Sequence, residues 1–150
     1  MSSRSLPEMR FHHIGIVSHD IAQSVAFYES LGYACSETFE DPIQNATIIF
    51  MHRPDSPLAE LIHPLGANSP AYGWVQRLQG SGPYHVCYEV DNLATGIAAL
   101  RAQRIYPIMK PVPAVAFGMR RVTFLWGKQS GLIELLEGAS VHENVRAQSR

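Results

Sequence analysis

Two histidines and two glutamates recur at matched spacing in this chain of 150 residues. Glu60 lies 47 positions after His13, and Glu134 lies 49 positions after His85. Neutral imidazoles and carboxylates together suit a divalent ion such as Co, Ni, Zn, Mn or Fe, and they do not suit soft Cu(I). Four protein ligands leave an octahedral ion two positions for water or substrate oxygens. Such an ion would polarise a carbonyl and stabilise negative charge on the oxygen of an enolate.

The matched spacing belongs to an internal repeat. A shift of 72 positions pairs His13 with His85, Ile14 with Val86, Asp20 with Asn92, Val25 with Ile97 and Ala26 with Ala98. Segment 59–62 parallels 133–136 after a shift of 74 positions. This self-similarity predicts two copies of one βαβββ unit whose sheets share a core. We therefore expect an α+β fold, with two modules in pseudo-twofold arrangement forming a cupped mixed sheet with helices outside.

Residue patterning predicts the elements that position these side chains. Apolar and β-branched runs predict strands at 11–17, 46–51, 58–63, 84–90, 105–110, 121–126 and 132–136. Helices are expected after the capping residue Asp20 and after a cap at Asp91 or Asn92, and a short helix over 70–79 after Ser69. The whole chain, 1–150, is then one domain, divided into module one at about 10–66, a connecting helix at about 69–80, module two at about 83–137 and a polar tail at 138–150.

Strand alternation predicts which way the first histidine pair points. His13 and Gly15 share one face of the first strand, while Ile14 and Ile16 share the other face, which is apolar enough to lie against a helix. His13 is therefore expected to point into the concave side of the sheet. His12 is expected on the opposite face, as a helix-packing or surface residue.

The two carboxylates lie in strands that are otherwise mostly Leu and Ile. An ionised carboxylate buried without a partner is costly, so a cation or a hydrogen-bond donor must meet it. One buried His or Glu is more often a hydrogen-bonded structural residue than a ligand. Their coincidence at equivalent positions of a repeat favours metal ligation by His13, Glu60, His85 and Glu134.

Composition excludes several classes of protein. Hydrophobic residues make up 46% of the chain and charged residues 17%, which indicates a globular protein with a sizeable core. The net charge of −1 gives no basic field for nucleic acid or an anionic membrane. Cys35 and Cys87 form neither a zinc-type pair nor a disulfide framework, which favours a reducing cytoplasm. Residues 1–10 lack the apolar stretch of a signal peptide, and no run is long enough to cross a bilayer.

Four segments in order resemble the vicinal oxygen chelate superfamily, which includes the glyoxalases, bleomycin resistance proteins and dioxygenases. They are HHIGIV at 12–17, AELIHPLG at 59–66, YHVCYEV at 84–90 and GLIEL at 131–135. Within the superfamily, the chain is most similar to the methylmalonyl-CoA epimerases, from about Phe11 to Glu137. The resemblance implies a divalent metal, with Co, Ni, Zn or Mn as candidates, and ligands at His13, Glu60, His85 and Glu134.

The implied function is that of a metal-dependent isomerase or epimerase. It would remove a proton α to the carbonyl of an acyl thioester such as methylmalonyl-CoA, through a metal-stabilised enolate, with Glu134 as the base. One segment departs from the epimerases, which carry Pro-Glu-Gln where this chain has Pro42-Ile43-Gln44. Ile43 cannot move a proton, although inversion at carbon needs a base on each face. Either Glu134 works alone, or Asp41 substitutes, or the reaction is a different one.

Other functions of the same scaffold remain open. One is a glyoxalase-like lyase acting on a thiol adduct, and another is a metal-free small-molecule binding or resistance protein. An extradiol-type dioxygenase would leave the fourth ligand position open for oxygen, and Glu60 in that position argues against it. The expected partners are a small-molecule substrate, with a coenzyme A or carrier-linked thioester as the candidate, and a second copy of the chain in a homodimer. Neither nucleic acid nor a membrane is expected.

Overall fold

The computed structural model describes residues 6–139, which form a mixed sheet of nine strands with three α-helices. The strands are β1 (Arg10–Val17), β2 (Ala34–Asp41), β3 (Ala46–His52), β4 (Ala59–Pro64), β5 (Gly82–Val90), β6 (Tyr106–Pro107), β7 (Val112–Pro113), β8 (Arg121–Gly127) and β9 (Gly131–Glu137). The helices are α1 (Ile21–Ser30), α2 (Tyr72–Leu78) and α3 (Leu93–Arg101), with a 3-10 turn, η1, at Val115–Phe117. Within 6–139, no helix is long and apolar enough to cross a membrane.

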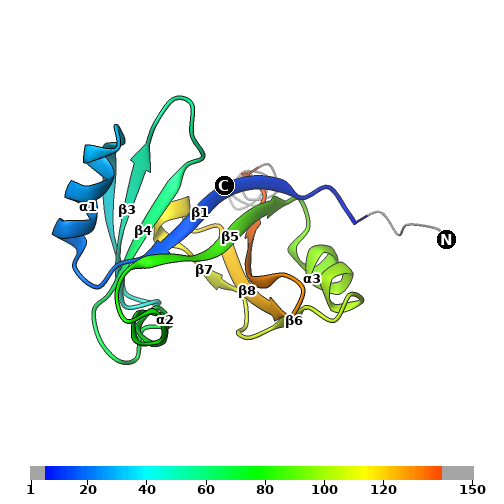
Figure 1. Ribbon diagram of the computed structural model, residues 1–150. Coiled ribbons are helices and arrows are strands. Elements are labelled where there is room, and N and C mark those ends of the chain that lie inside the picture. Colours follow the sequence, from blue (N-terminus) through cyan, green and yellow to red (C-terminus); the bar gives the residue numbers. More distant parts are fainter. Residues whose placement is uncertain (1–5, 140–150) are drawn as a thin grey trace, which may run out of the picture.

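The strand order shows two copies of one module. The sheet runs β2-β3-β4-β1-β5-β9-β8-β6, with β7 paired to β8. In each half, the first strand lies parallel to the last one, β1 to β4 and β5 to β9, and the two halves meet where β1 and β5 pair antiparallel. Helices α1 and α3 lie at opposite ends of the molecule (Figure 1). The sheet is open, and the predicted pair of βαβββ modules is confirmed.

Helix starts follow the capping prediction in two of three cases. The side chain of Asp20 accepts a hydrogen bond from the backbone N–H of Gln23, and that of Asn92 accepts one from the N–H of Thr95. The third prediction is wrong, because α2 starts after Ala71 with no side-chain cap. Ser69 is instead buried, with a hydroxyl that has no hydrogen-bond partner among the described residues.

The short or polar strands were the ones that patterning described poorly. β2 was not predicted, because this edge strand is mostly exposed and polar and so lacks an apolar alternation. The strand predicted over 105–110 is reduced to the two residues of β6. Proline at 107 and 111 removes the N–H groups that a longer ladder would need. Most of the predicted polar tail, from residue 140 onward, lies outside the described residues.

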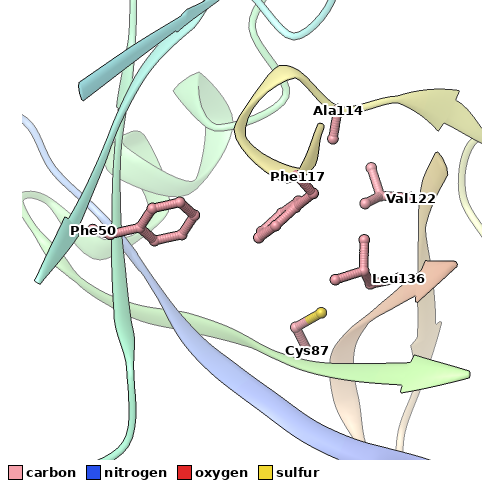
Figure 2. Packing of buried hydrophobic residues seen from close by; sticks show 6 residues of the cluster. All are labelled: Phe50, Cys87, Ala114, Phe117, Val122 and Leu136. Atoms are coloured by element: carbon pink, nitrogen blue, oxygen red, sulfur yellow. The ribbon is translucent and has the colours of Figure 1, made fainter. Parts of the chain in front are cut away.

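One apolar cluster joins the two modules. It contains Phe50 of β3, Cys87 of β5, Phe117 of η1, and Val122 and Leu136 of β8 and β9. Figure 2 shows Phe117 between Phe50 and the remaining side chains of the cluster. The rings of Phe50 and Phe117 lie 5.6 Å apart. A loop of the second module therefore packs directly against a strand of the first module.

Two β-bulges interrupt the pairing of β1 with β5. Phe11 pairs with Tyr88 and His13 with Cys87, so His12 is an extra residue on β1. Gly15 pairs with His85 and Ile16 with Pro83, so Tyr84 is an extra residue on β5. The expectation that His12 faces away from His13 is wrong, because strict alternation fails at a bulge. His12 and Tyr84 are also equivalent in the 72-residue repeat, so each half carries a bulge directly before its histidine.

Candidate metal centre

The four central strands bring the two histidines and two glutamates to one point. Nε2 of His13 lies 3.1 Å from Oε1 of Glu134, 3.4 Å from Oε2 of Glu60 and 3.2 Å from Nε2 of His85. Nε2 of His85 lies 3.5 Å from the same oxygen of Glu134. All four side chains are at most 3% exposed. The four residues that the sequence singled out thus form one buried cluster, which we call the quartet.

Several polar atoms of the quartet have no hydrogen-bond partner among residues 6–139. They are Oε2 of Glu60, Oε1 of Glu134 and Nδ1 of His85, all fully buried. Buried carboxylate oxygens are costly when they lack a donor or a cation. Ligand atoms of His13, Glu60 and His85 also lie within 4.8 Å of one another. The orphaned oxygens and this mixed set of nitrogen and oxygen donors fit a divalent ion of the borderline-hard class.

The two carboxyl groups differ in their surroundings. Burial raises the pKa of Glu60 to about 8, although the charge of His13 acts in the opposite direction. Burial also acts to raise the pKa of Glu134, but the neighbouring imidazoles of His13 and His85, whose Nε2 atoms lie 3.1 and 3.5 Å from its Oε1, outweigh burial and hold this pKa well below its ordinary value. Glu134 is therefore ionised at neutral pH, whereas Glu60 carries a proton there in the metal-free protein.

Metal affinity should consequently rise with pH. An ion that binds the carboxylate of Glu60 must displace its proton, so below pH 8 each unit of pH should raise the affinity by up to about tenfold. Above pH 8 Glu60 is already ionised, so its effect on the rise of metal affinity with pH should level off. Competition between the protein and a chelator for Co²⁺ at pH 6.5, 7.5 and 8.5 measures this slope. The Glu60→Gln variant should bind more weakly and with a shallower slope, and an equally steep slope in that variant would contradict the assignment to Glu60.

His85 lies directly against the backbone of Gly15. A β-carbon at position 15 would fall 1.9 Å from Cε1 of His85 and 2.3 Å from each ring nitrogen. Gly15 pairs with Glu60 on β4 and with His85 on β5, so it lies at the centre of the quartet. Glycine is therefore required here by the close approach of the imidazole and not by its own backbone angles.

Aromatic rings pack against both histidines of the quartet. Phe117 stacks on the ring of His13 with centroids 5.5 Å apart, and Phe124 meets the ring of His85 edge-on at 5.1 Å. Nδ1 of His13 lies 2.9 Å from Nδ1 of His12. Burial lowers the pKa of His12 to about 4, with a further contribution from His13, so this imidazole is neutral at pH 7.

A cavity of about 160 Å³ lies near the quartet: none of the four side chains lines it, but Tyr84 and Phe124, whose rings contact that of His85, do. Ile62 lies two residues along β4 from Glu60, and Leu132 lies two residues along β9 from Glu134, so both line the cavity on the quartet's face of the sheet. Trp74, Ile108, Met109 and Phe124 add further apolar wall, while Gln44, Ser69 and Tyr84 supply the polar groups. The cavity can therefore hold a mostly apolar group next to the quartet.

The segment that departs from the epimerase pattern lies at the edge of this cavity. Gln44 lines the cavity, whereas Ile43 is 49% exposed and does not. Asp41 is buried, and its carboxylate accepts hydrogen bonds from the backbone N–H groups of Ile43 and Gln44 and from the side chain of Gln44. Asp41 thus fixes the turn between β2 and β3 and does not line the cavity.

Sequence reasoning missed Tyr84, Trp74 and Ser69 as cavity residues. Strict strand alternation would place Tyr84 on the face opposite His85, but the bulge turns it toward the cavity, where its ring lies 4.5 Å from that of His85. Trp74 and Ser69 come from the connecting segment, whose packing against the sheet is a tertiary feature. For Tyr84, a signal was available in the sequence, because positions 12 and 84 are equivalent in the repeat and each directly precedes a histidine of the quartet.

A family model matches most of the chain. Residues 12–124 match the Glyoxalase/Bleomycin resistance protein/Dioxygenase superfamily. The chain therefore belongs to this superfamily, which is the vicinal oxygen chelate superfamily of the sequence analysis.

Similar proteins within the superfamily are epimerases. The chain is 33% identical over 129 residues to the mitochondrial methylmalonyl-CoA epimerase of Homo sapiens, covering 84% of this chain and 72% of that protein. It is 29% identical over 129 residues to the ethylmalonyl-CoA/methylmalonyl-CoA epimerase of Cereibacter sphaeroides, covering 84% of this chain and 96% of that protein.

Solved structures show the same fold. The methylmalonyl-CoA epimerase of Mycobacterium tuberculosis superposes with a TM-score of 0.75 at 24% identity, covering 93% of each chain. A methylmalonyl-CoA epimerase in complex with methylmalonyl-CoA and NH4+ superposes with a TM-score of 0.72 at 25% identity, covering 91% of this chain and 98% of that one.

Proposed function

We propose that this protein is a metal-dependent epimerase that removes the proton α to the carbonyl of an acyl-CoA thioester such as methylmalonyl-CoA. One observation carries the proposal: two imidazoles and two carboxylates converge within 3.1–3.5 Å beside a cavity, in a chain that is 33% identical to a methylmalonyl-CoA epimerase. His13, Glu60, His85 and Glu134 would hold the ion. A bound divalent ion supplies Lewis-acid stabilisation of negative charge on the carbonyl oxygen.

Glu134 acts as the base that accepts the α-proton. Its carboxylate is ionised at neutral pH, because the imidazoles of His13 and His85 lie within 3.5 Å of it and hold its pKa low. The C–H bond breaks, its proton passes to Glu134, and its electron pair moves toward the carbonyl to give an enolate. The apolar walls of the cavity limit the access of water, which preserves the enolate until it is reprotonated. Return of a proton to the opposite face of the α-carbon then inverts the centre.

Tyr84 is the group that we assign to the opposite face. Among the side chains that line the cavity it carries a phenolic proton, whereas Gln44 has no proton that it can readily transfer. Burial raises the pKa of Tyr84 well above its ordinary value, so the group is a phenol at neutral pH. This assignment is an alternative to Asp41, which accepts hydrogen bonds from the backbone and does not line the cavity.

Replacing Tyr84 by Phe separates exchange from inversion. Glu134 should still exchange the α-proton of one epimer with solvent, while inversion should slow by about 10²-fold, because general acid catalysis on the second face is lost. Proton NMR in deuterated water follows exchange, and optical activity follows inversion in the same sample. Equal slowing of both processes in Tyr84→Phe would contradict the two-sided assignment.

The experiment that tests the proposed function uses the metal-loaded protein in deuterated water. With methylmalonyl-CoA, we expect deuterium to enter the α-carbon, and treatment with a chelator should abolish this exchange. No exchange with methylmalonyl-CoA or any related acyl thioester would overturn the proposal. Turnover of a thiol adduct of an α-ketoaldehyde would then favour the glyoxalase-like alternative, and binding without turnover would favour a resistance protein.

A surface cavity beside the first one suits the carrier part of a thioester. It is lined by Trp74, Arg77, Ile108, Trp126 and Leu132, three of which also line the quartet's cavity. The guanidinium of Arg77 lies 4.9 Å from the ring of Trp74, and the centroids of the Trp74 and Trp126 rings lie 6.2 Å apart. Aromatic faces and a cation are the groups that bind an adenine ring and phosphates. We assign this cavity to the nucleotide end of coenzyme A.

Replacing Arg77 by Ala should therefore weaken only the binding of the nucleotide end of coenzyme A. The KM for methylmalonyl-CoA should rise by about tenfold, as expected for the loss of a charged contact to phosphate, with little change in kcat. A thioester truncated at the pantetheine, which lacks the nucleotide, provides the control, and its KM should not change. An equal rise in KM for both thioesters would contradict this placement.

We further propose that the protein is a cytoplasmic homodimer. Pairing is common among superfamily members of this length, and both cysteines are free thiols, which a reducing compartment permits. Sedimentation equilibrium of the purified protein tests the dimer, and localisation of a tagged chain tests the compartment.

A further inference from the structure

His12 lies at the β1 bulge, directly beside one member of the quartet. The bulge turns its ring to the same side as that of His13, and the two Nδ1 atoms lie 2.9 Å apart. The two rings are nearly perpendicular, with an angle of 83° between them. Phe117 contacts both rings, stacking on His13 and meeting His12 edge-on at 5.3 Å. His12 is thus held in place by packing and contacts His13 through a single pair of nitrogen atoms.

We propose that His12 is a positioning residue for His13: its Nδ1 accepts a hydrogen bond from Nδ1–H of His13 and thereby fixes the tautomer that can bind an ion. This inference rests on the metal centre proposed above and adds to it a residue outside the quartet. It predicts that His12 sets metal affinity without being a ligand.

The argument follows from the two nitrogens of His13. Nε2 faces Glu60, Glu134 and His85 at 3.1–3.4 Å, so this atom must carry the lone pair when an ion binds. A neutral imidazole that presents Nε2 carries its proton on Nδ1. The atom within hydrogen-bond distance of that proton is Nδ1 of His12. If His12 donated instead, the proton of a neutral His13 would lie on Nε2 and block the ion.

The second half of the molecule offers an internal contrast. Tyr84 occupies the equivalent bulge, but it makes no hydrogen bond to His85, whose buried Nδ1 has no partner in the described part of the chain. His85 is located by its close approach to Gly15. Partners that hold the second nitrogen of a ligating histidine typically contribute 10–100-fold to metal affinity, about the size of effect expected of His12. Tyr84 should contribute nothing through this route.

Two variants at position 12 separate the hydrogen bond from the packing. His12→Phe keeps a ring against Phe117 but removes the acceptor, whereas His12→Asn places an amide oxygen near the position of Nδ1. We expect Zn²⁺ to bind His12→Phe about 10–100-fold more weakly than the wild type, as measured by competition with a chelator. His12→Asn should recover most of the affinity, and Tyr84→Phe should bind Zn²⁺ as the wild type does. Thermal melting in the absence of metal verifies that each variant is folded.

Nitrogen-15 NMR of the zinc-loaded wild type gives a second readout that packing alone would not change. His13 should be protonated at Nδ1 and His12 at Nε2. Equal zinc affinity in the wild type and His12→Phe would overturn the role of His12 alone, while failure of the wild type to bind zinc would overturn the metal centre as well.

The ligand atoms of His12, His13 and Cys87 also lie within 4.8 Å of one another. Two zinc ions per chain, one of them lost in His12→Phe, would therefore show that His12 is a ligand and overturn the positioning role.

Discussion

Replacing Glu134 by Gln should lower the rate of α-proton exchange by about 10⁴-fold, the largest effect that we expect from any single change. The amide keeps the shape of the side chain, but it cannot accept the α-proton and it carries no charge for the ion. General base catalysis alone contributes up to about 10⁴-fold. Loss of a carboxylate ligand adds to this by weakening metal binding. The initial rate of deuterium incorporation into methylmalonyl-CoA, at saturating Co²⁺, measures the effect.

Glu137→Gln is the matched control for this change. Glu137 ends the same strand, β9, and is also buried, but its carboxylate accepts a hydrogen bond from Nε of Arg121 at 2.7 Å and lies outside the quartet. Its removal should affect stability and leave the exchange rate within a few-fold of the wild type. A Glu134→Gln protein that exchanges within tenfold of the wild-type rate would show that another group is the base.

Replacing Gly15 by Ala should weaken metal binding by about 10³-fold, more than the loss of a partner that only orients a ligand. The added β-carbon would lie 1.9 Å from Cε1 of His85, far inside van der Waals contact. The imidazole must therefore leave its position or the two central strands must separate. Both responses remove one nitrogen ligand from the quartet, and the second also lowers the melting temperature. Titration with Co²⁺ and thermal melting of the metal-free variant measure the two effects separately.

Gly73→Ala is the corresponding control, because a β-carbon at position 73 of α2 would meet nothing within 4 Å. Alanine is also the better helix former by roughly 1 kcal/mol, so this change should be neutral or stabilising. Metal affinity in Gly73→Ala should equal that of the wild type. If Gly15→Ala also bound Co²⁺ with unchanged affinity, the position of His85 in the quartet would be wrong.

The quartet was predictable because a repeat carries more information than a single site. His13 and Glu60 alone could have been structural residues, but the same residue types recur at the same positions of the second half. The fold class followed from the same repeat, and two helix caps followed from local side-chain chemistry. The structure places all four side chains together, while their role as ligands stays a proposal.

The features that escaped prediction depend on contacts between distant segments. Strand alternation assumes an uninterrupted ladder, and the bulges at His12 and Tyr84 break that assumption at the two positions next to the quartet. The cavity combines residues from β3, β4, α2, β5, β8 and β9 with their loops, so no local pattern describes it. The nearness of His85 to Gly15 is likewise a property of strand pairing.

The metal content of the purified protein tests the central claim most directly. After loading with Co²⁺ or Zn²⁺ and removal of free ions by gel filtration, elemental analysis should find about one divalent ion per chain in the wild type. His13→Ala and Glu134→Ala should each retain much less than one. A wild type that holds no ion, or full occupancy in both variants, would contradict the proposal that the quartet is a metal centre.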